Sequence, residues 1–303
     1  MSHVLNRTAA PAASATTGGR RRRLGQKAGR QHHGGPLTYA LLVFAAVVSL
    51  FPLYWNLVAA SHTGERVVQA PSPLLPGREL FNNLSIAWNQ VDMGEALINT
   101  TIVAGAVATS TVLFATLAGF AFAKLRFKGR NVLLAIVVAT MTVPPQLSVI
   151  PLYQLITEFG WVNQLQSVIL PSLVAAFGVF FMRQYLLEAL PVELIEAARM
   201  DGAHSLRIIW HVVFPIARPA MAVLGMLIFV QAWNDFFWPF IALTPDGAPT
   251  LQVALAGLGS GNHTVNHAIV LTGAFIATVP LLLVFALLGK HIVGGITSGA
   301  VKS

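Results

Sequence analysis

The chain has 303 residues, of which 55% are apolar and only 10% charged, and it contains no cysteine. Soluble domains average about 25% charged residues, so this composition indicates a protein surrounded largely by lipid. The lack of cysteine excludes a disulfide scaffold, a thiolate zinc site and a cysteine nucleophile. The net charge of +8 is compatible with nucleic-acid binding or with membrane topology.

Residues 1–35 form a basic segment rich in Ala, Ser, Thr, Gly and Arg, with almost no large apolar side chains. This composition predicts a disordered tail that precedes one transmembrane domain, residues 36–303. The run Arg20–Arg23 is compatible with nucleic-acid binding, but a short basic cluster beside a membrane segment is more typical of contact with anionic lipid. We therefore expect membrane lipid, and no nucleic acid, as a partner.

Six apolar runs follow, and each approaches or exceeds the roughly 20 residues that span a bilayer. They cover approximately residues 37–60, 98–123, 132–153, 165–187, 219–243 and 268–291. Prolines such as Pro144, Pro145 and Pro280 lie inside some runs, which membrane helices tolerate because neighbouring helices satisfy the freed backbone groups. The pattern predicts an all-α integral membrane fold with six transmembrane helices.

The basic residues are distributed asymmetrically about these six runs. Seventeen of the nineteen Lys and Arg residues lie in the first tail, in the loops after the second and fourth runs, or near the C-terminus. Only Arg66 and Arg78, in the loop 61–97, lie on the other side. Cytoplasmic loops carry an excess of Lys and Arg, so we predict a multi-pass protein of the cytoplasmic membrane with both termini cytoplasmic and the loop 61–97 outside.

The cytoplasmic loop at about 188–215 has the pattern of two short helices. Gly202 is placed to end the first helix as a left-handed cap. The second helix carries apolar residues at the i, i+3, i+4, i+7 spacing from Leu206, and we expect Pro215 to end it. Two interpretations stay open: an amphipathic hairpin that lies on lipid, or a docking element for a cytoplasmic partner.

This loop resembles the EAA loop of ABC-importer permeases, in which Glu-Ala-Ala is followed after three residues by Gly, and later by an apolar residue and Leu-Pro. Here Val stands where that family usually has Ile, and Phe-Pro replaces Leu-Pro; both departures keep an apolar side chain. The matching residues are Glu196, Ala197, Ala198, Gly202, Val212, Phe214 and Pro215.

Further elements are similar to the same family. Asn99-Thr100 resembles the Asn-Ser that opens its second helix, and Pro144-Pro145 followed by Pro151-Leu152-Tyr153 resembles its third-helix pattern. Trp233-Asn234-Asp235 and the segment 297–302 resemble the carbohydrate-uptake branch, on the side of the maltose-type G subunit. The likeness covers the chain from the first apolar run to the end.

The resemblance implies a type I ABC importer permease fold with a cytoplasmic EAA coupling helix. Its implied partners are a second homologous permease that forms a heterodimer, a cytoplasmic ATPase dimer, and an extracytoplasmic sugar-binding protein or lipoprotein. The chain carries no G-x-x-x-x-G-K-[ST] phosphate loop. We therefore expect a transport subunit that is not an enzyme and holds no cofactor, with ATP and Mg bound by the partner ATPase.

The implied function is ATP-driven import of a sugar, a di- or oligosaccharide. Two alternatives stay open: an ABC importer permease for a non-sugar solute, and an ion-coupled secondary transporter with Asp235 as its ion or proton site. His263 and His267 are four residues apart but lack a third ligand, so we predict no metal site.

The resemblance also implies residue roles at the cytoplasmic loop. Glu196 would make a charged contact with the ATPase, Ala197 and Ala198 would allow its close approach, and Gly202 would set the angle between the two short helices. Asp201, Val212 and Pro215 complete this predicted ATPase-coupling set.

A second candidate site lies in the fifth apolar run. Polar side chains inside a membrane normally face protein or a water-filled path. The hypothesis for Asn234 and Asp235, with Gln231 and Trp233 beside them, is a translocation path whose side chains bond sugar hydroxyls. The alternative is that Asn234 and Asp235 bridge helices of the two permeases.

Overall fold

The computed structural model describes the backbone of residues 35–244, 247–259 and 265–300, with side chains up to residue 287 in the last range. The predicted tail lies outside these residues apart from its last position, as do His263, Val301 and Lys302. The described residues are helical or irregular and contain no strand. The all-α prediction is therefore confirmed for this part of the chain.

The described chain divides into two units at Ser49 and Leu50. In the first unit the described helix comprises the beginning of α1, and every side chain of that part is exposed. The second unit holds the remaining elements. The helical elements are α1 (Pro36–Ala60), α2 (Gly64–Val68), α3 (Leu80–Gln90), α4 (Met93–Lys124), α5 (Arg130–Thr140), η1 (Pro145–Ser148), α6 (Val149–Glu158), α7 (Gln166–Ile169), η2 (Leu170–Ser172), α8 (Ala176–Ala189), α9 (Val192–Met200), α10 (Ser205–Ile208), η3 (Ile209–Val213), α11 (Phe214–Trp233), α12 (Phe237–Ala242), α13 (Leu251–Leu258) and α14 (His267–Ala300).

The number of candidate membrane-spanning helices agrees with the predicted six when a bent pair is counted as one span. Within the described residues, five helical stretches are long and apolar enough to cross a bilayer, and a bent pair of helices makes a sixth when it is counted as one span. The five are Pro36–Ala60, Met93–Lys124, Gln166–Ala189, Ser205–Trp233 and His267–Leu287. The chain is therefore a multi-pass membrane protein.

The third apolar run is not the continuous helix that we expected. Its two halves, Arg130–Thr140 and Pro145–Glu158, meet at an angle of 92°. Pro144 and Pro145 stand at this break, and neither residue has a backbone N–H to continue the helical ladder. The prediction that a helix would pass through these prolines was wrong.

The fifth span begins earlier and ends earlier than predicted. It runs from Ser205 to Trp233, so the second short helix of the cytoplasmic loop is the start of the span. Pro215 does not end that helix, because the π-helical turn Ile209–Val213 lies directly before it and the wider ladder accommodates the missing N–H. The helix stops instead at Asn234, before the predicted boundary at residue 243.

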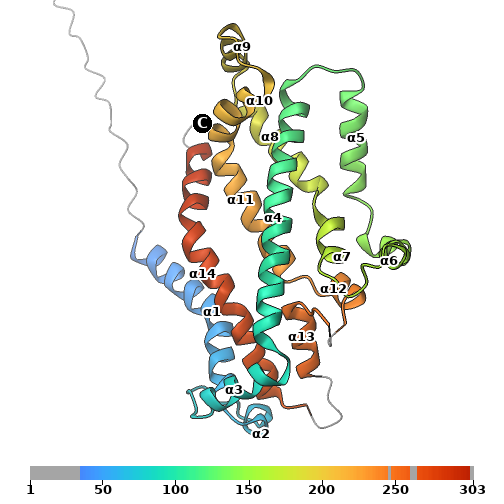
Figure 1. Ribbon diagram of the computed structural model, residues 1–303. Helices are drawn as coiled ribbons and strands as arrows, with labels where there is room; N and C mark the ends of the chain where they lie inside the picture. The colour runs from blue at the N-terminus through green and yellow to red at the C-terminus, as the bar shows by residue number, and fades with distance from the viewer. Residues whose placement is uncertain (1–34, 245–246, 260–264, 301–303) are drawn as a thin grey trace, which may run out of the picture. The chain divides into compact units, whose positions relative to one another are not determined.

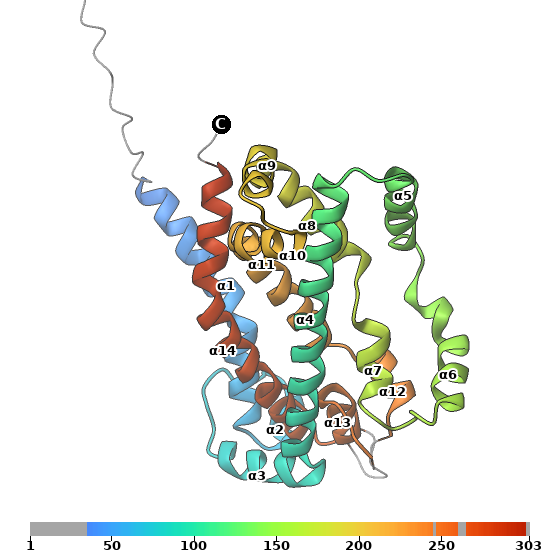
Figure 2. The ribbon, with the colours of Figure 1, turned by 45° about the horizontal axis from the view of Figure 1, so that its top comes forward.

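The second unit has two distinct ends (Figure 1). The helix α9 lies at the same end as the connection between α4 and α5, whereas α2, α3 and α13 lie at the opposite end. Figure 2 shows the same arrangement after rotation. The basic residues 124–130 therefore share an end with α9, and Arg66 and Arg78 belong to the other end.

The core of this unit is built on α4, which packs against α8 and α11. Small residues let the helices approach closely. A Cβ atom on Gly119 would lie 2.8 Å from the backbone nitrogen of Arg183, and one on Gly178 would lie 3.1 Å from the Cβ of Ala115. Close packing of this kind drives helix association where the surroundings are as apolar as the helices.

The Asn99-Thr100 pair of α4 fastens α13 to this core. The Asn99 side-chain amide donates a 3.1 Å hydrogen bond to the carbonyl of Pro249. The Thr100 hydroxyl accepts a 2.7 Å bond from the backbone N–H of Leu251, the first residue of α13. Both side chains are buried, so the pair satisfies backbone groups at the start of α13 that would otherwise lack partners.

We predict that Gly119→Ala destabilises the protein, because the added methyl group would press on the backbone of α8, which cannot rotate away. The expected cost is about 1–3 kcal/mol, measured as a lower thermal unfolding midpoint of the purified transporter complex. Gly105→Ala, in the same helix, is the matched control because nothing lies within 4 Å of its added Cβ. Equal midpoints for the two variants would contradict the packing argument.

Candidate functional site

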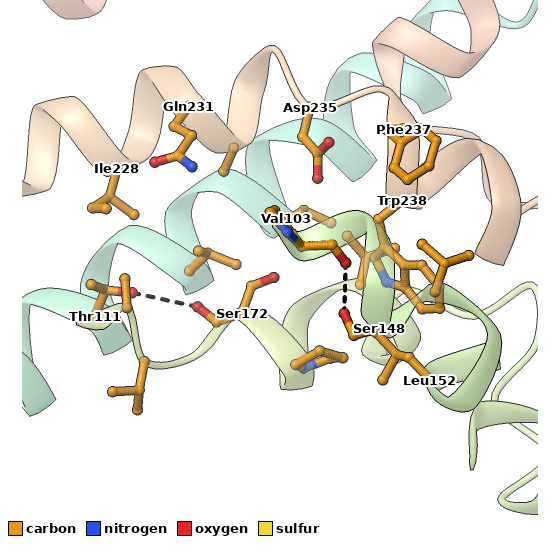
Figure 3. Close-up of a pocket in the computed structure, with 18 of the residues that line it drawn as sticks. Val103, Thr111, Ser148, Leu152, Ser172, Ile228, Gln231, Asp235, Phe237 and Trp238 are labelled. Atoms are coloured by element: carbon orange, nitrogen blue, oxygen red, sulfur yellow. Dashed lines mark hydrogen bonds between the residues drawn. The ribbon is translucent and has the colours of Figure 1, made fainter. Parts of the chain in front are cut away.

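A pocket of about 420 Å³ lies where α11 ends and α12 begins, facing α4 and the segments that follow the break in the third span. Figure 3 shows the labelled side chains of Gln231, Asp235 and Trp238 around it. The described residues that line the pocket are Val103, Val107, Thr111, Pro145, Gln146, Ser148, Val149, Leu152, Val168, Pro171, Ser172, Val174, Ala175, Ile228, Gln231, Ala232, Asp235, Phe237 and Trp238.

The end of α11 places two polar side chains at this pocket. The Asn234 amide donates a 2.8 Å hydrogen bond to the carbonyl of Val230, one turn earlier, and Asn234 is the C-terminal cap of the helix. Asn and Asp side chains compete with the backbone for hydrogen bonds and favour helix ends over interiors. Asp235 follows the helix end, and Gln231 lies one turn before it, so both reach the pocket.

The pocket wall contains hydroxyl groups that already make hydrogen bonds within the protein and side-chain amides that make none to the described residues. The Ser148 hydroxyl donates to the carbonyl of Pro145 at 2.7 Å, and the Thr111 hydroxyl lies 3.4 Å from the carbonyl of Ser172, the two bonds drawn in Figure 3. Within the described part of the chain, the amides of Gln146 and Gln231 make no side-chain hydrogen bond. These amides can donate to and accept from a ligand.

Two aromatic residues at the start of α12 complete the pocket. The Trp238 indole N–H donates a 2.9 Å hydrogen bond to the carbonyl of Ser167, which fixes the orientation of the ring. Phe237 is exposed beside it. A pocket with flat apolar faces and free amides can bind a molecule that presents both apolar and hydroxyl-bearing surfaces.

The structure separates the four residues predicted for the translocation path. Gln231 and Asp235 line the pocket, and Trp233 and Asn234 do not. Trp233 is 2% exposed, stacks on Phe229 with ring centroids 5.6 Å apart, and donates its indole N–H to the carbonyl of Ala277 in α14 at 3.2 Å. Asn234 is exposed and bonds back to its own helix.

Sequence reasoning did not find the contribution of the third span to this pocket. Gln146 and Ser148 belong to η1, directly after the proline pair. A double proline inside an apolar run is a signal that could have indicated them, because irregular backbone at membrane depth occurs where it lines a cavity or is buried in protein.

The loop at about residues 188–215 contains the predicted helix α9, which ends as expected at a left-handed glycine. Gly202 has φ +77°, its N–H bonds the carbonyl of Arg199 at 3.0 Å, and the Ala203 N–H bonds the carbonyl of Ala198 at 2.9 Å. This pair of bonds is a Schellman motif. No atom lies within 4 Å of the position of a Gly202 Cβ, so backbone conformation alone favours glycine there.

One face of α9 holds the loop on the core, and the other is open. Ile195 is 3% exposed and belongs to the core around α4, and Ala198 packs against the same core. Glu196 and Ala197 are exposed, as are Asp201 and Gly202 beyond the helix end. The prediction that this segment presents a surface therefore has a structural basis in the alternation of these side chains.

The exposed surface of α9 and α10 is partly apolar. Met200 is 88% exposed, and Leu206 and Trp210 are also exposed. Val212, by contrast, is half-buried against the core, and Pro215 lies exposed in the first turn of α11. Among the described residues, no group of three or more His, Asp or Glu side chains could hold a metal ion.

Comparison with known proteins identifies the family. Residues 111–297 match the family model described as the binding-protein-dependent transport system inner membrane component. The chain is 30% identical over 264 residues to the lactose transport system permease protein LacG of Rhizobium radiobacter, which covers 87% of this chain and 95% of that protein. It is 33% identical over 231 residues to the melibiose/raffinose/stachyose import permease protein MelC of Bacillus subtilis, which covers 76% and 83%.

The fold is similar to that of a solved transporter. One chain of a bacterial ABC transporter involved in the import of the acidic polysaccharide alginate matches with a TM-score of 0.70 and 25% sequence identity, over 84% of this chain and 94% of that one. The family match covers the second half of α4, all of α8 and α9, and the pocket side chains of α11 and α12. This chain therefore belongs to the family of inner membrane permease components of binding-protein-dependent ABC transport systems.

Proposed function

We propose that this chain is a permease subunit of an ATP-driven importer in the cytoplasmic membrane, and that its solute is a sugar, a di- or oligosaccharide. Membership of the permease family favours ATP-driven import over an ion-coupled transporter. The names of two relatives specify lactose and the melibiose/raffinose/stachyose group. The observation that carries the proposal is the pocket at the end of α11, where free amides and aromatic faces meet.

The pocket residues have complementary roles in this proposal. The amides of Gln146 and Gln231 and the carboxylate of Asp235 bond sugar hydroxyls, while Phe237 and Trp238 cover the apolar faces of the rings. We propose a second homologous permease as the opposite wall of the path, so that the two subunits together enclose the sugar.

Asn234 and Trp233 receive different roles. Asn234 is exposed and lies off the pocket, which supports contact with the second permease rather than with the sugar. Trp233 ties α11 to α14 through its indole N–H. It is a positioning residue that holds Gln231 and Asp235 in place.

We propose that α9 docks on an ATPase dimer. Exposed Glu196 supplies a charged contact, Ala197 permits close approach, and the apolar side chains of Met200, Leu206 and Trp210 gain burial on docking. The sites for ATP and Mg belong to that ATPase. An element that packs on the permease core and also contacts the ATPase can couple the two.

We propose an orientation that the two ends of the second unit support. The end with α9 also carries the basic residues 124–130, which supports a cytoplasmic location for it. The opposite end, with α2, α3 and α13, then faces an extracytoplasmic sugar-binding protein. In this orientation both termini of the chain are cytoplasmic.

Uptake of radiolabelled sugars tests the proposed function. Cells that lack this chain are expected to lose uptake of one or more members of a panel of neutral di- and oligosaccharides, and re-expression restores it. Unchanged uptake of every sugar, together with lost uptake of a non-sugar solute, would overturn the sugar assignment.

The left-handed cap at Gly202 yields one prediction about coupling. In Gly202→Val, the side chain fits in open space but the backbone conformation costs about 1–2 kcal/mol, which shifts α9 relative to α10. We expect an assembled complex whose sugar-stimulated ATP hydrolysis falls roughly five- to tenfold. Gly202→Asn is the matched control, since Asn tolerates positive φ; equal loss in both variants would contradict the conformational argument.

The pocket yields a second prediction. Gln231→Ala and Asp235→Ala should each lower sugar uptake roughly tenfold, since each removes a hydrogen bond to the sugar, and should leave the yield of purified complex unchanged. Asn234→Ala should instead lower the yield of complex. If Asn234→Ala impairs uptake at full yield, or if the pocket variants fail to assemble, the roles assigned to these residues are wrong.

A further inference from the structure

The pocket is lined by several polar side chains, but among the described residues only one of them is charged. Of the nineteen described residues that line it, Asp235 is acidic and none is Lys, Arg or His. The polar remainder consists of hydroxyl and amide side chains. Within the described chain, a ligand in this pocket therefore meets one formal negative charge and no positive one.

The immediate partners of the Asp235 carboxylate are uncharged. The backbone N–H groups of Phe237 and Trp238, in the first turn of α12, lie close to it. Among the described residues, Asp235 makes no ion pair, so its charge is available to the interior of the pocket.

The described basic side chains belong to other parts of the second unit. Lys124, Arg126, Lys128 and Arg130 lie in and beside the connection between α4 and α5, at the end that carries α9. Arg218 lies in the first turns of α11, more than three helical turns before Gln231. None of them lines the pocket.

A single charge in a site with apolar walls discriminates strongly between ligands of different charge. The reason is that the interaction energy of two charges rises as the surroundings become less polar. An anionic ligand would pay both for the loss of its hydration and for repulsion by Asp235. A neutral polyhydroxylated ligand meets no charge repulsion and has a smaller dehydration cost than an ion, and its hydroxyls can donate to the carboxylate.

We propose that Asp235 makes this pocket selective for uncharged sugars and excludes sugars that bear carboxylate or phosphate groups. The inference rests on the proposed function and narrows its substrate class. The specificity acts inside the membrane, in addition to any selection by a binding protein.

Because the chain contains no cysteine, a single introduced thiol can report the electrostatic potential in the pocket. Ser148→Cys places a unique thiol on the pocket wall, and Ser85→Cys places one on exposed α3 as the control. The assembled complex, with partner subunits made free of cysteine, is treated with methanethiosulfonate reagents of similar size that are cationic, neutral or anionic. The second-order rate of labelling is measured for each.

We expect Cys at position 148 to react on the order of five- to tenfold faster with the cationic than with the anionic reagent. Asp235→Asn, in the same background, should bring that ratio close to one and leave the ratio at position 85 unchanged. A ratio at position 148 that does not respond to Asp235→Asn overturns the proposal. Val174→Cys, also on the pocket wall, replaces the first reporter if the Ser148 variant does not fold.

Protection by sugars completes the test. Raffinose, a neutral trisaccharide, should slow labelling by the neutral reagent at millimolar concentration, whereas trigalacturonate, an anionic trisaccharide, should not. With Asp235→Asn, trigalacturonate should gain protection relative to raffinose. Equal protection by the two sugars in the reporter variant that retains Asp235 overturns the charge selectivity.

The two proposals fail in different ways. If neither sugar protects and no sugar uptake depends on this chain, the proposed function fails, whatever the reagent ratio. If raffinose and trigalacturonate protect equally while sugar uptake depends on this chain, the function stands and the selectivity of Asp235 fails.

Discussion

The close approach of α4 to α8 and α11 is the contact on which the rest of the second unit depends. Gly119 lets α4 lie against the backbone of α8, and Gly178 lets α8 lie against Ala115 of α4. In a bilayer these contacts cannot gain from the exclusion of water, so their strength comes from shape and dispersion. Because α4 also holds α13 through Asn99 and Thr100, one helix positions both the pocket wall and an element at the end opposite α9.

The pocket exists because two helices stop where an apolar run continues. The proline pair turns the third span by 92°, and Asn234 ends α11 while apolar residues follow it. Each break places polar side chains beside the other: Gln146 and Ser148 from the first, Gln231 and Asp235 from the second. A bundle of uninterrupted helices would have filled this volume with apolar side chains.

Much of the helical architecture was predictable because the length of apolar runs is a strong signal in membrane proteins. The cap at residue 202 was predictable because a glycine directly after a helical pattern commonly adopts the left-handed conformation. Gly202 does so, with φ +77°. The paths through Pro144 and Pro215 were not, since proline can break a helix or be absorbed by a π-helical turn, and the outcome depends on neighbouring helices. Likewise, adjacent residues Trp233, Asn234 and Asp235 share a motif, yet helical geometry and the break send them to three different environments.

The uninterrupted helical path from α10 to α11 has a mechanical consequence. Its 29 residues, Ser205–Trp233, form a continuous helix roughly 43 Å long at 1.5 Å per residue. The loop that carries α9 precedes one end of this helix, and Gln231 lies near the other. Torque applied to α10 would turn the pocket wall by direct transmission, with no intervening flexible joint. The π-helical turn at Ile209–Val213 widens the hydrogen-bond ladder near the start of this helix, so a rotation applied at α10 would have to pass through it.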